Sequence, residues 1–215
     1  MRFAKITQIA PTEIEAESFR IIEAELAPEK RARFTREEFA VVRRCIHATG
    51  DFSFADTMRF GQDAVNAGLG AIQAGKNILV DVQMAAHGIS KGLLERFGGQ
   101  VICRVSDAEV ANKAKSEGKT RSEAAMEMAA GENIGIVAIG NAPTALLKVM
   151  ELIEDGVFRP DLVIGVPVGF VNAAESKEIL AGQAYPFITA LGRKGGTPVS
   201  VASMNALLRL ASNHG

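Results

Sequence analysis

The chain of 215 residues has no tryptophan, one tyrosine and only two cysteines. So few aromatic residues argue against a flat aromatic surface for ligand stacking. Cys45 and Cys103 allow at most one disulfide, which excludes a disulfide-rich scaffold, and we expect both to be reduced thiols. The formal net charge of −1 gives no general attraction to nucleic acid or to an anionic membrane.

Long apolar runs are also missing. The longest, such as "NIGIVAIG", are far too short to span a bilayer. The opening "MRFAKITQIAPTEIE" lacks the apolar region of a secretory signal. We therefore expect a cytoplasmic protein whose partners include neither a membrane nor a nucleic acid.

The usual nucleotide signatures are absent as well. The sequence has no G-x-x-x-x-G-K-[ST] motif. The glycines of "GLGAIQAG" fall inside a predicted helix rather than between a strand and a helix, and "GRKGGTP" has the wrong spacing. A nucleotide-dependent oxidoreductase is therefore disfavoured.

The periodicity that is present indicates helices first. They are predicted over residues 12–26, 35–50 and 59–74. Thr12 is the expected N-cap of the first, with an apolar face of Ile14, Phe19, Ile22 and Leu26. "TREE" is a capping box for the second, with Thr35 as N-cap and Glu38 at the third position.

Short, β-branched, almost continuously apolar runs follow: "NILVDV", "QVICRV", "IGIVAI", "LVIGV" and "PFITAL". Helical segments separate them, a pattern typical of a parallel sheet buried on both faces. We predict an α/β fold in which residues 1–215 form a single domain. Its core is a doubly wound, mainly parallel five-stranded sheet with helices on both faces.

The segments after these strands are rich in Gly, Pro, Asn, Ser and Thr, and most open into helices. Ligands of open parallel sheets bind beyond the carboxyl ends of the strands, where helix N-termini favour anions. Arg193 and Lys194 add two positive charges in the last of these loops. Each glycine alone is explained by a turn, but four such loops on one edge favour a site for several carboxylates or phosphates.

Three histidines remain to be explained. His47 lies in the last turn of the second helix, where the helix dipole favours a protonated ring that can donate a proton. Asp51 follows four residues later and is a candidate to orient that ring. The alternative is ordinary capping of a helix C-terminus by a basic residue. His87 follows the first strand, and His214 lies in the tail. No two histidines have a metal-ligand spacing, so we predict no protein-bound metal.

Seven motifs in order resemble those of the precorrin-8X methylmutase family, which includes the cobalt-precorrin-8 methylmutases. They are "ESFRIIEAEL", "RRCIHATGD", "DVQMAAHGI", "TRSEAAM", "GNAPTALLKVMELI", "GVPVGFVNAAESKEIL" and "GRKGGTPVSVASMNALL", from about Ile14 to Leu210. The resemblance implies a doubly wound α/β isomerase of cobalamin biosynthesis that needs no cofactor. Such an enzyme moves a methyl group from C-11 to C-12 of a tetrapyrrole, giving hydrogenobyrinate or cobyrinate. It also implies a homodimer with the substrate near the subunit interface.

The same resemblance implies roles for particular residues. His47 becomes the catalytic proton donor, at the end of the R-x-x-H motif that starts at Arg44. The residues expected to bind the substrate are Ser18, Arg44, Met84, Arg121, Asn141, Arg193, Gly195 and Thr197. Thr197 stands where members of the family often have serine.

Simpler interpretations accompany several of these residues. Ser18 and Arg44 also suit a solvated helix face, Arg121 suits a position near a helix cap, and Glu175 and Lys177 suit a local surface pair. A corrinoid carrier without catalytic activity is the alternative function. The sequence does not distinguish a cobalt-bearing substrate from a metal-free one.

Overall fold

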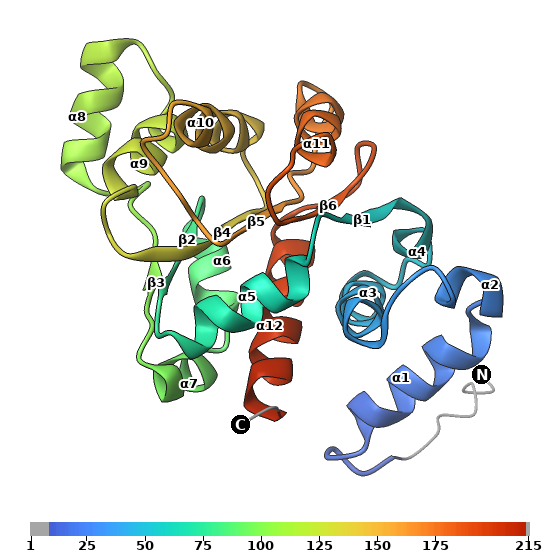
Figure 1. Ribbon diagram of the computed structural model, residues 1–215. Helices are drawn as coiled ribbons and strands as arrows, with labels where there is room; N and C mark the ends of the chain where they lie inside the picture. The colour runs from blue at the N-terminus through green and yellow to red at the C-terminus, as the bar shows by residue number, and fades with distance from the viewer. Residues whose placement is uncertain (1–8, 214–215) are drawn as a thin grey trace, which may run out of the picture.

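All five apolar runs form strands in the computed structural model, which describes residues 9–213, and a sixth strand joins them (Figure 1). The strands are β1 (Met58–Phe60), β2 (Asn77–Val80), β3 (Val101–Ile102), β4 (Ile134–Ile139), β5 (Leu162–Gly165) and β6 (Phe187–Ala190). Their order in the sheet is β1-β6-β5-β4-β2-β3. Strands β2 to β6 are parallel, and β1 pairs antiparallel with β6 at one edge.

The predictions of five strands and of one helix over residues 59–74 were therefore wrong in the same segment, which contains the sixth strand. The segment divides into the short helix α4 (Phe54–Thr57), the strand β1 and the helix α5 (Ala64–Gln73). Met58 and Phe60 pair with Ala190 and Ile188 of β6, more than 120 residues later in the chain. This distant pairing decides the conformation of three residues that local periodicity assigns to a helix.

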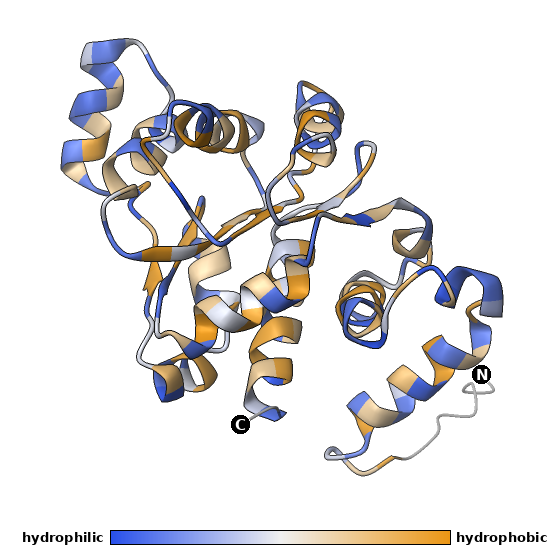
Figure 2. Cartoon of the chain, in the orientation of Figure 1, coloured by the Kyte–Doolittle hydropathy of each residue, from blue (hydrophilic) through white to orange (hydrophobic). Residues whose placement is uncertain are grey.

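Alternate residues of the strands enter two separate apolar cores. In β4, Ile136 and Ala138 face one core, whereas Val137 and Ile139 face the other. All six residues of this strand are buried, as expected for a central strand of a parallel sheet covered on both faces. In Figure 2 the central strands are coloured mostly as hydrophobic.

Helices cover both faces of the sheet (Figure 1). The first core includes residues of α5, α6 (Gln83–Gly88), α7 (Lys91–Leu94) and α12 (Thr197–Asn213), and of α1 (Ile14–Glu25), α3 (Arg36–Thr49) and α4. The second includes residues of α8 (Ala108–Glu117), α9 (Arg121–Ala129), α10 (Pro143–Glu154) and α11 (Ala173–Ala181). The doubly wound α/β prediction is confirmed. The remaining short helices are α2 (Pro28–Arg31) and the 3₁₀ turn η1 (Glu95–Phe97).

Helix α3 carries His47 to the carboxyl edge of the sheet. It starts at the predicted capping box of Thr35 and Glu38 and ends at Gly50, whose φ of 65° is the left-handed conformation that glycine adopts easily. The Cys45 thiol contacts the Ser203 hydroxyl at 3.3 Å and the Val199 backbone oxygen at 3.8 Å in the first turns of α12. The C-terminal end of α3 thus lies beside the start of α12, which follows β6.

Helix α1 is attached more loosely than its sequence suggests. Thr12 is not its N-cap: Glu13 holds that position and makes no side-chain capping bond. Ile22 is the one buried residue of this helix, and Ile14, expected on its apolar face, is 51% exposed. Within residues 9–213, no helix combines the length and the hydropathy needed to cross a membrane.

Candidate active site

The carboxyl edge of the sheet is organised around the buried carboxylate of Asp81. This residue directly follows β2 and accepts hydrogen bonds from the backbone N–H groups of Gly140, Asn141 and Ala142, at 3.1, 2.8 and 2.7 Å. The chain after β2 continues into α6 on one face of the sheet, and the chain after β4 continues into α10 on the other face. Asp81 therefore lies between two neighbouring strands whose connections diverge, which is where ligands of doubly wound sheets usually bind. Burial raises the pKa of Asp81, against the effect of the three N–H groups. Asp81 was not among the predicted residues, although a charge at the end of an apolar strand was the available signal.

The loop between β6 and α12 makes the closest backbone contacts at this edge. A Cβ on Gly195 would lie 2.3 Å from the backbone oxygen of Val166, so a side chain has no room there. A Cβ on Gly140 would lie 2.7 Å from Cα of Thr197. Thr197 is buried at the start of α12. These glycines let the loops after β4, β5 and β6 meet, and they bring the predicted Asn141, Gly195 and Thr197 into one region.

Two lysines connect this loop to its surroundings, and both contacts correct an expectation. Lys177 does not form a surface pair with Glu175: it is fully buried, and its Nζ donates to the backbone oxygen of Lys194 at 2.7 Å. Asp51 does not orient His47 by a hydrogen bond. It accepts instead from Lys194 Nζ at 2.6 Å and from the Ser53 N–H at 2.9 Å, because the loop before α12 brings the ammonium group within reach.

His47 is exposed in the last turn of α3, at the end predicted from the capping pattern. Its ring meets the ring of Phe19 edge-on, with centroids 5.5 Å apart. The guanidinium groups of Arg43 and Arg44 lie over the same Phe19 ring, at 4.2 and 5.2 Å from its centroid. The imidazole is therefore accessible to a ligand and stands beside two cations.

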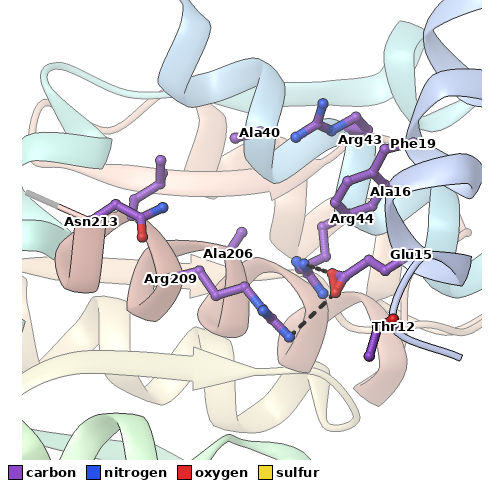
Figure 3. Close-up of a pocket in the computed structure, with 11 residues that line it drawn as sticks. Thr12, Glu15, Ala16, Phe19, Ala40, Arg43, Arg44, Ala206, Arg209 and Asn213 are labelled. Carbon is purple, nitrogen blue, oxygen red and sulfur yellow. Dashed lines mark hydrogen bonds and ion pairs between the residues drawn. The ribbon is translucent and has the colours of Figure 1, made fainter.

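A cavity of about 360 Å³ lies next to this group, between α1, α3 and α12 (Figure 3). The Glu15 carboxylate occupies its charged side, paired with Arg44 and 3.4 Å from Arg209. Burial acts to raise the pKa of Glu15, but the hydrogen bond from Arg44 and the positive charges of Arg44, Arg209 and His47 outweigh it and lower the pKa. Arg209 was not among the predicted residues, because nothing in the local sequence of α12 distinguishes it.

The other predicted residues lie at three places. Ser18 is half-buried on α1, one residue before Phe19, and its hydroxyl donates within the helix to the Ile14 oxygen at 2.8 Å. Met84 is 69% exposed in the first turn of α6, after β2. Arg121 is exposed at the start of α9, next to Thr120, whose hydroxyl is 3.2 Å from that of Thr144 in α10. The capping box Thr120–Glu123 accounts for the start of α9 without the Arg121 side chain.

An exposed apolar surface borders this edge. Val168, Phe170 and Val171 of the loop after β5 are 48%, 84% and 76% exposed. The Arg193 guanidinium lies 5.4 Å from the centroid of the Phe170 ring. Apolar surface and arginines are thus combined at the carboxyl edge.

The remaining histidines and the cysteines add no further candidate site among the described residues. Within the described part of the chain, no three His, Cys, Asp or Glu side chains gather as metal ligands would. Both cysteines are free, and burial raises the pKa of Cys45 to about 12, so its thiol is a poor nucleophile. His87 is exposed, and its Nδ1 is 2.7 Å from the Gln83 oxygen of the same helix. His214 lies outside the described residues.

These features define an α/β protein that presents an accessible histidine, several arginines and apolar loops to a ligand at the carboxyl edge of its sheet. The sequence profile of the precorrin-8X methylmutase family matches residues 13–210. The chain belongs to this family.

Individual relatives agree with the family match. A cobalt-precorrin-8 methylmutase of Priestia megaterium is 47% identical over 206 residues, covering 95% of this chain and 90% of the relative. A precorrin-8X methylmutase of a Sinorhizobium species is 40% identical, covering 89% and 91%. The crystal structure of a precorrin-8X methylmutase from Thermus thermophilus superposes with a TM-score of 0.87 at 47% identity, covering 95% of this chain and 98% of that one. The predicted membership and fold are therefore confirmed.

Proposed function

We propose that this protein catalyses the migration of a methyl group from C-11 to C-12 of precorrin-8X, or of its cobalt-bearing form, to give hydrogenobyrinate or cobyrinate. The observation that carries the proposal is the exposed His47 in the last turn of α3, in a chain whose family profile spans residues 13–210. No separate cofactor takes part, because the methyl group moves within the conjugated ring.

The substrate is an apolar macrocycle with several acid side chains, and the carboxyl edge offers groups of both kinds. Arg193 and Arg121 are exposed there for bidentate pairing with carboxylates, and Arg44 is mostly buried in its pair with Glu15. Met84 and Phe170 offer apolar surface to the ring. We assign the remaining polar contacts to Ser18, Asn141, Gly195 and Thr197.

His47 donates a proton, or a hydrogen bond, to the nitrogen of the pyrrole ring that carries the migrating methyl group. Protonation of the nitrogen draws electrons toward it and stabilises the rearranged ring. The protein supplies no nucleophile, so its contribution is orientation of the ring and control of its protonation.

The test is incubation with the metal-free and with the cobalt-bearing substrate, following the visible spectrum of the corrin. We expect His47→Ala to fold and to bind product, since the ring is exposed, but to lose turnover by about 100-fold or more. His87→Ala is the matched control, because His87 is also an exposed histidine in the last turn of a helix. It should change turnover by less than about threefold.

Each result bears on one part of the proposal. Normal turnover in His47→Ala would exclude a catalytic role for this residue. Tight product binding by the unaltered protein, without conversion of either substrate, would favour the corrinoid carrier instead. The substrate that is converted faster decides between the cobalt-bearing and the metal-free reaction.

We further propose that two chains associate with their carboxyl edges near each other, in the cytoplasm. The cavity of about 360 Å³ is lined by Phe19, Arg43 and Arg44 and not by His47 itself. It is small for a tetrapyrrole with its acid side chains, so one chain alone leaves much of the ring uncovered. The exposed Phe170 and Val171 supply apolar surface for a second copy to cover. The substrate would then be enclosed near the subunit interface.

A further inference from the structure

Lys177 of α11 is a fully buried lysine that the proposed reaction does not use. Lysine is almost never fully buried without a partner, because removing an ammonium group from water is costly. Burial lowers the pKa of Lys177 to about 8. Among the hydrogen bonds of the described residues, its Nζ makes one, to the backbone oxygen of Lys194 at 2.7 Å. The role of this side chain is therefore to be sought in that contact.

The contact completes a set of bonds that hold the loop 191–196 by its backbone. The Arg193 oxygen accepts from the Gly169 N–H at 3.3 Å, and the Gly196 N–H donates to the Val166 oxygen at 2.8 Å. Lys177 holds the carbonyl between them. All three partners belong to the connection between β5 and β6, so one neighbouring segment fixes the path of this loop.

The side chain of Lys194 ties the same loop to the end of α3. Its Nζ is 2.6 Å from the Asp51 carboxylate and 3.1 Å from the Ser53 hydroxyl. Asp51 follows His47 by four residues. A continuous series of polar contacts therefore leads from the buried Lys177, through Lys194, to the turn that carries the histidine.

We propose that Lys177 is a positioning residue: its ammonium group fixes the backbone at Lys194 and so holds Arg193 and Gly195 in place near the end of α3 that carries His47. A donor with a long, flexible stem is needed to reach a loop carbonyl from α11, and a charged donor makes a stronger hydrogen bond than a neutral one. That the loop is held follows from the contacts alone. That its position matters for substrate binding rests on the proposed function.

The first arm of the test needs no substrate. Arg193 and Lys194 are exposed neighbouring basic residues, so trypsin reports directly on opening of this loop. We expect Lys177→Met to be cut after Arg193 or Lys194 about tenfold faster than the unaltered protein, since cleavage follows the population of the open loop. Mass spectrometry of the fragments identifies the bonds cut.

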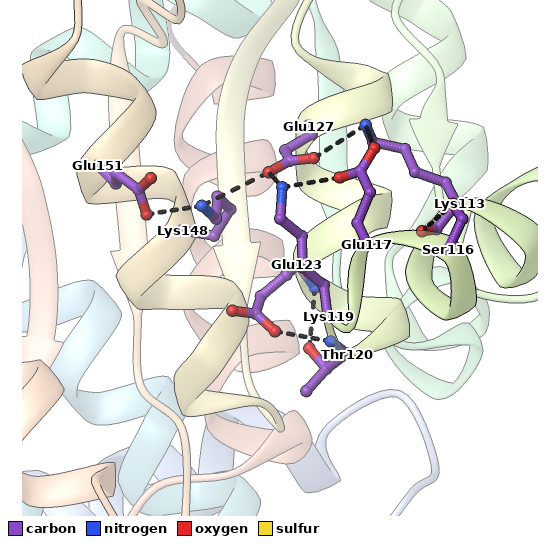
Figure 4. Close-up of polar contacts among 9 residues, drawn as sticks. All are labelled: Lys113, Ser116, Glu117, Lys119, Thr120, Glu123, Glu127, Lys148 and Glu151. Carbon is purple, nitrogen blue, oxygen red and sulfur yellow. Dashed lines mark hydrogen bonds and ion pairs between the residues drawn. The ribbon is translucent and has the colours of Figure 1, made fainter.

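The matched control is Lys148→Met on α10. Lys148 is also buried, but its Nζ pairs with Glu151 at 2.6 Å and with Glu127 at 3.5 Å, within a network of α8, α9 and α10 (Figure 4). Compared at equal folded fraction, it should leave cleavage after Arg193 and Lys194 within about twofold of the unaltered rate.

The second arm measures methylmutase kinetics. If the loop orients the acid side chains of the substrate, Lys177→Met should raise KM about tenfold or more and change kcat by less than about threefold. Lys177→Gln keeps an N–H donor without the charge and should give intermediate values in both arms. This variant also carries the test if Lys177→Met does not fold.

The outcomes separate the parts of the proposal. Unchanged cleavage in both Lys177 variants would overturn it, as would equally fast cleavage at the same bonds in Lys148→Met. Faster cleavage with an unchanged KM would overturn the link to substrate binding while leaving the loop contact established. If the unaltered protein converts neither substrate, the proposed function fails but the proteolysis result still stands.

Discussion

At the scale of single residues, the ion pair of Asp51 and Lys194 gives the protein a defined response to acid. The hydrogen bonds from Lys194 and Ser53 lower the pKa of Asp51 from 3.8 to about 2. A carboxyl whose pKa is lower in the folded state stabilises that state above its unfolded pKa, and this contribution is lost as the pH falls toward the folded value. The Lys194 side chain is largely exposed and that of Asp51 is partly exposed, so solvent screening leaves only about 0.5 kcal/mol.

We therefore predict that Asp51→Asn lowers the free energy of unfolding by about 0.5 kcal/mol near neutral pH and has little effect near pH 2. Urea unfolding at a series of pH values measures the difference between the two proteins. Lys194→Met should show the same pH-dependent loss of unfolding free energy relative to the unaltered protein, because it deletes the other partner of the ion pair. A constant difference between Asp51→Asn and the unaltered protein over this range would contradict the assignment of the low pKa to Asp51.

The position of His47 was predictable from the sequence, whereas its surroundings were not. The capping box at Thr35 and the glycine at position 50 define α3 from local signals, and these place His47 in its last turn. Lys177 and Asp51 both form their hydrogen bonds with Lys194, which lies 17 residues from the first and 143 residues from the second. A local interpretation pairs each with a near neighbour in sequence, and the tertiary fold decides otherwise.

At the scale of elements, the two predicted N-caps allow a direct comparison. The Thr35 hydroxyl accepts from the Glu38 N–H at 3.2 Å, and the Glu38 carboxylate accepts from the Thr35 N–H at 2.8 Å. Thr12 makes no such bond to α1 and instead lines the cavity beside Glu15. We expect Thr35→Ala to cost about 1 kcal/mol of unfolding free energy and Thr12→Ala less than about 0.3 kcal/mol, as measured by urea denaturation.

The same two variants also test how the start of α3 affects the end that carries His47. Because the capping box lies three turns before His47, Thr35→Ala should keep normal turnover at temperatures where it remains folded. Equal losses of stability in Thr35→Ala and Thr12→Ala would show that the capping box contributes nothing specific.

Among the elements, the strands that coincide with apolar runs were predicted well, whereas the three-residue strand β1 was missed. The buried strands β2, β4, β5 and β6 coincide with the apolar runs, because a strand covered on both faces has apolar residues at most of its positions. β1 has only three residues, and its central Arg59 bonds to the backbone oxygens of Asp56 and Met58. Its pairing with β6 is a long-range event that no short window contains.

At the scale of the whole molecule, the exposed apolar residues are distributed unevenly between the two edges of the sheet. Val168, Phe170 and Val171 follow β5 at the carboxyl edge, next to Arg193. At the opposite edge Val157, 65% exposed, lies in the turn that leads into β5. The proposed interface would enclose the substrate at the carboxyl edge. It would therefore bury Val168, Phe170 and Val171 and would leave Val157 exposed.

This difference predicts the outcome of two matched substitutions. The unaltered protein should sediment with about twice the chain mass of 22.8 kDa. Phe170→Glu places a charge within the apolar surface and should shift the sedimenting mass to that of one chain, whereas Val157→Glu should leave it unchanged. If the substrate is enclosed between two carboxyl edges, Phe170→Glu must weaken product binding in parallel with the loss of the dimer. A Phe170→Glu protein that remains dimeric, or a Val157→Glu protein that becomes monomeric, would place the interface elsewhere and leave the ring to be covered by one chain alone.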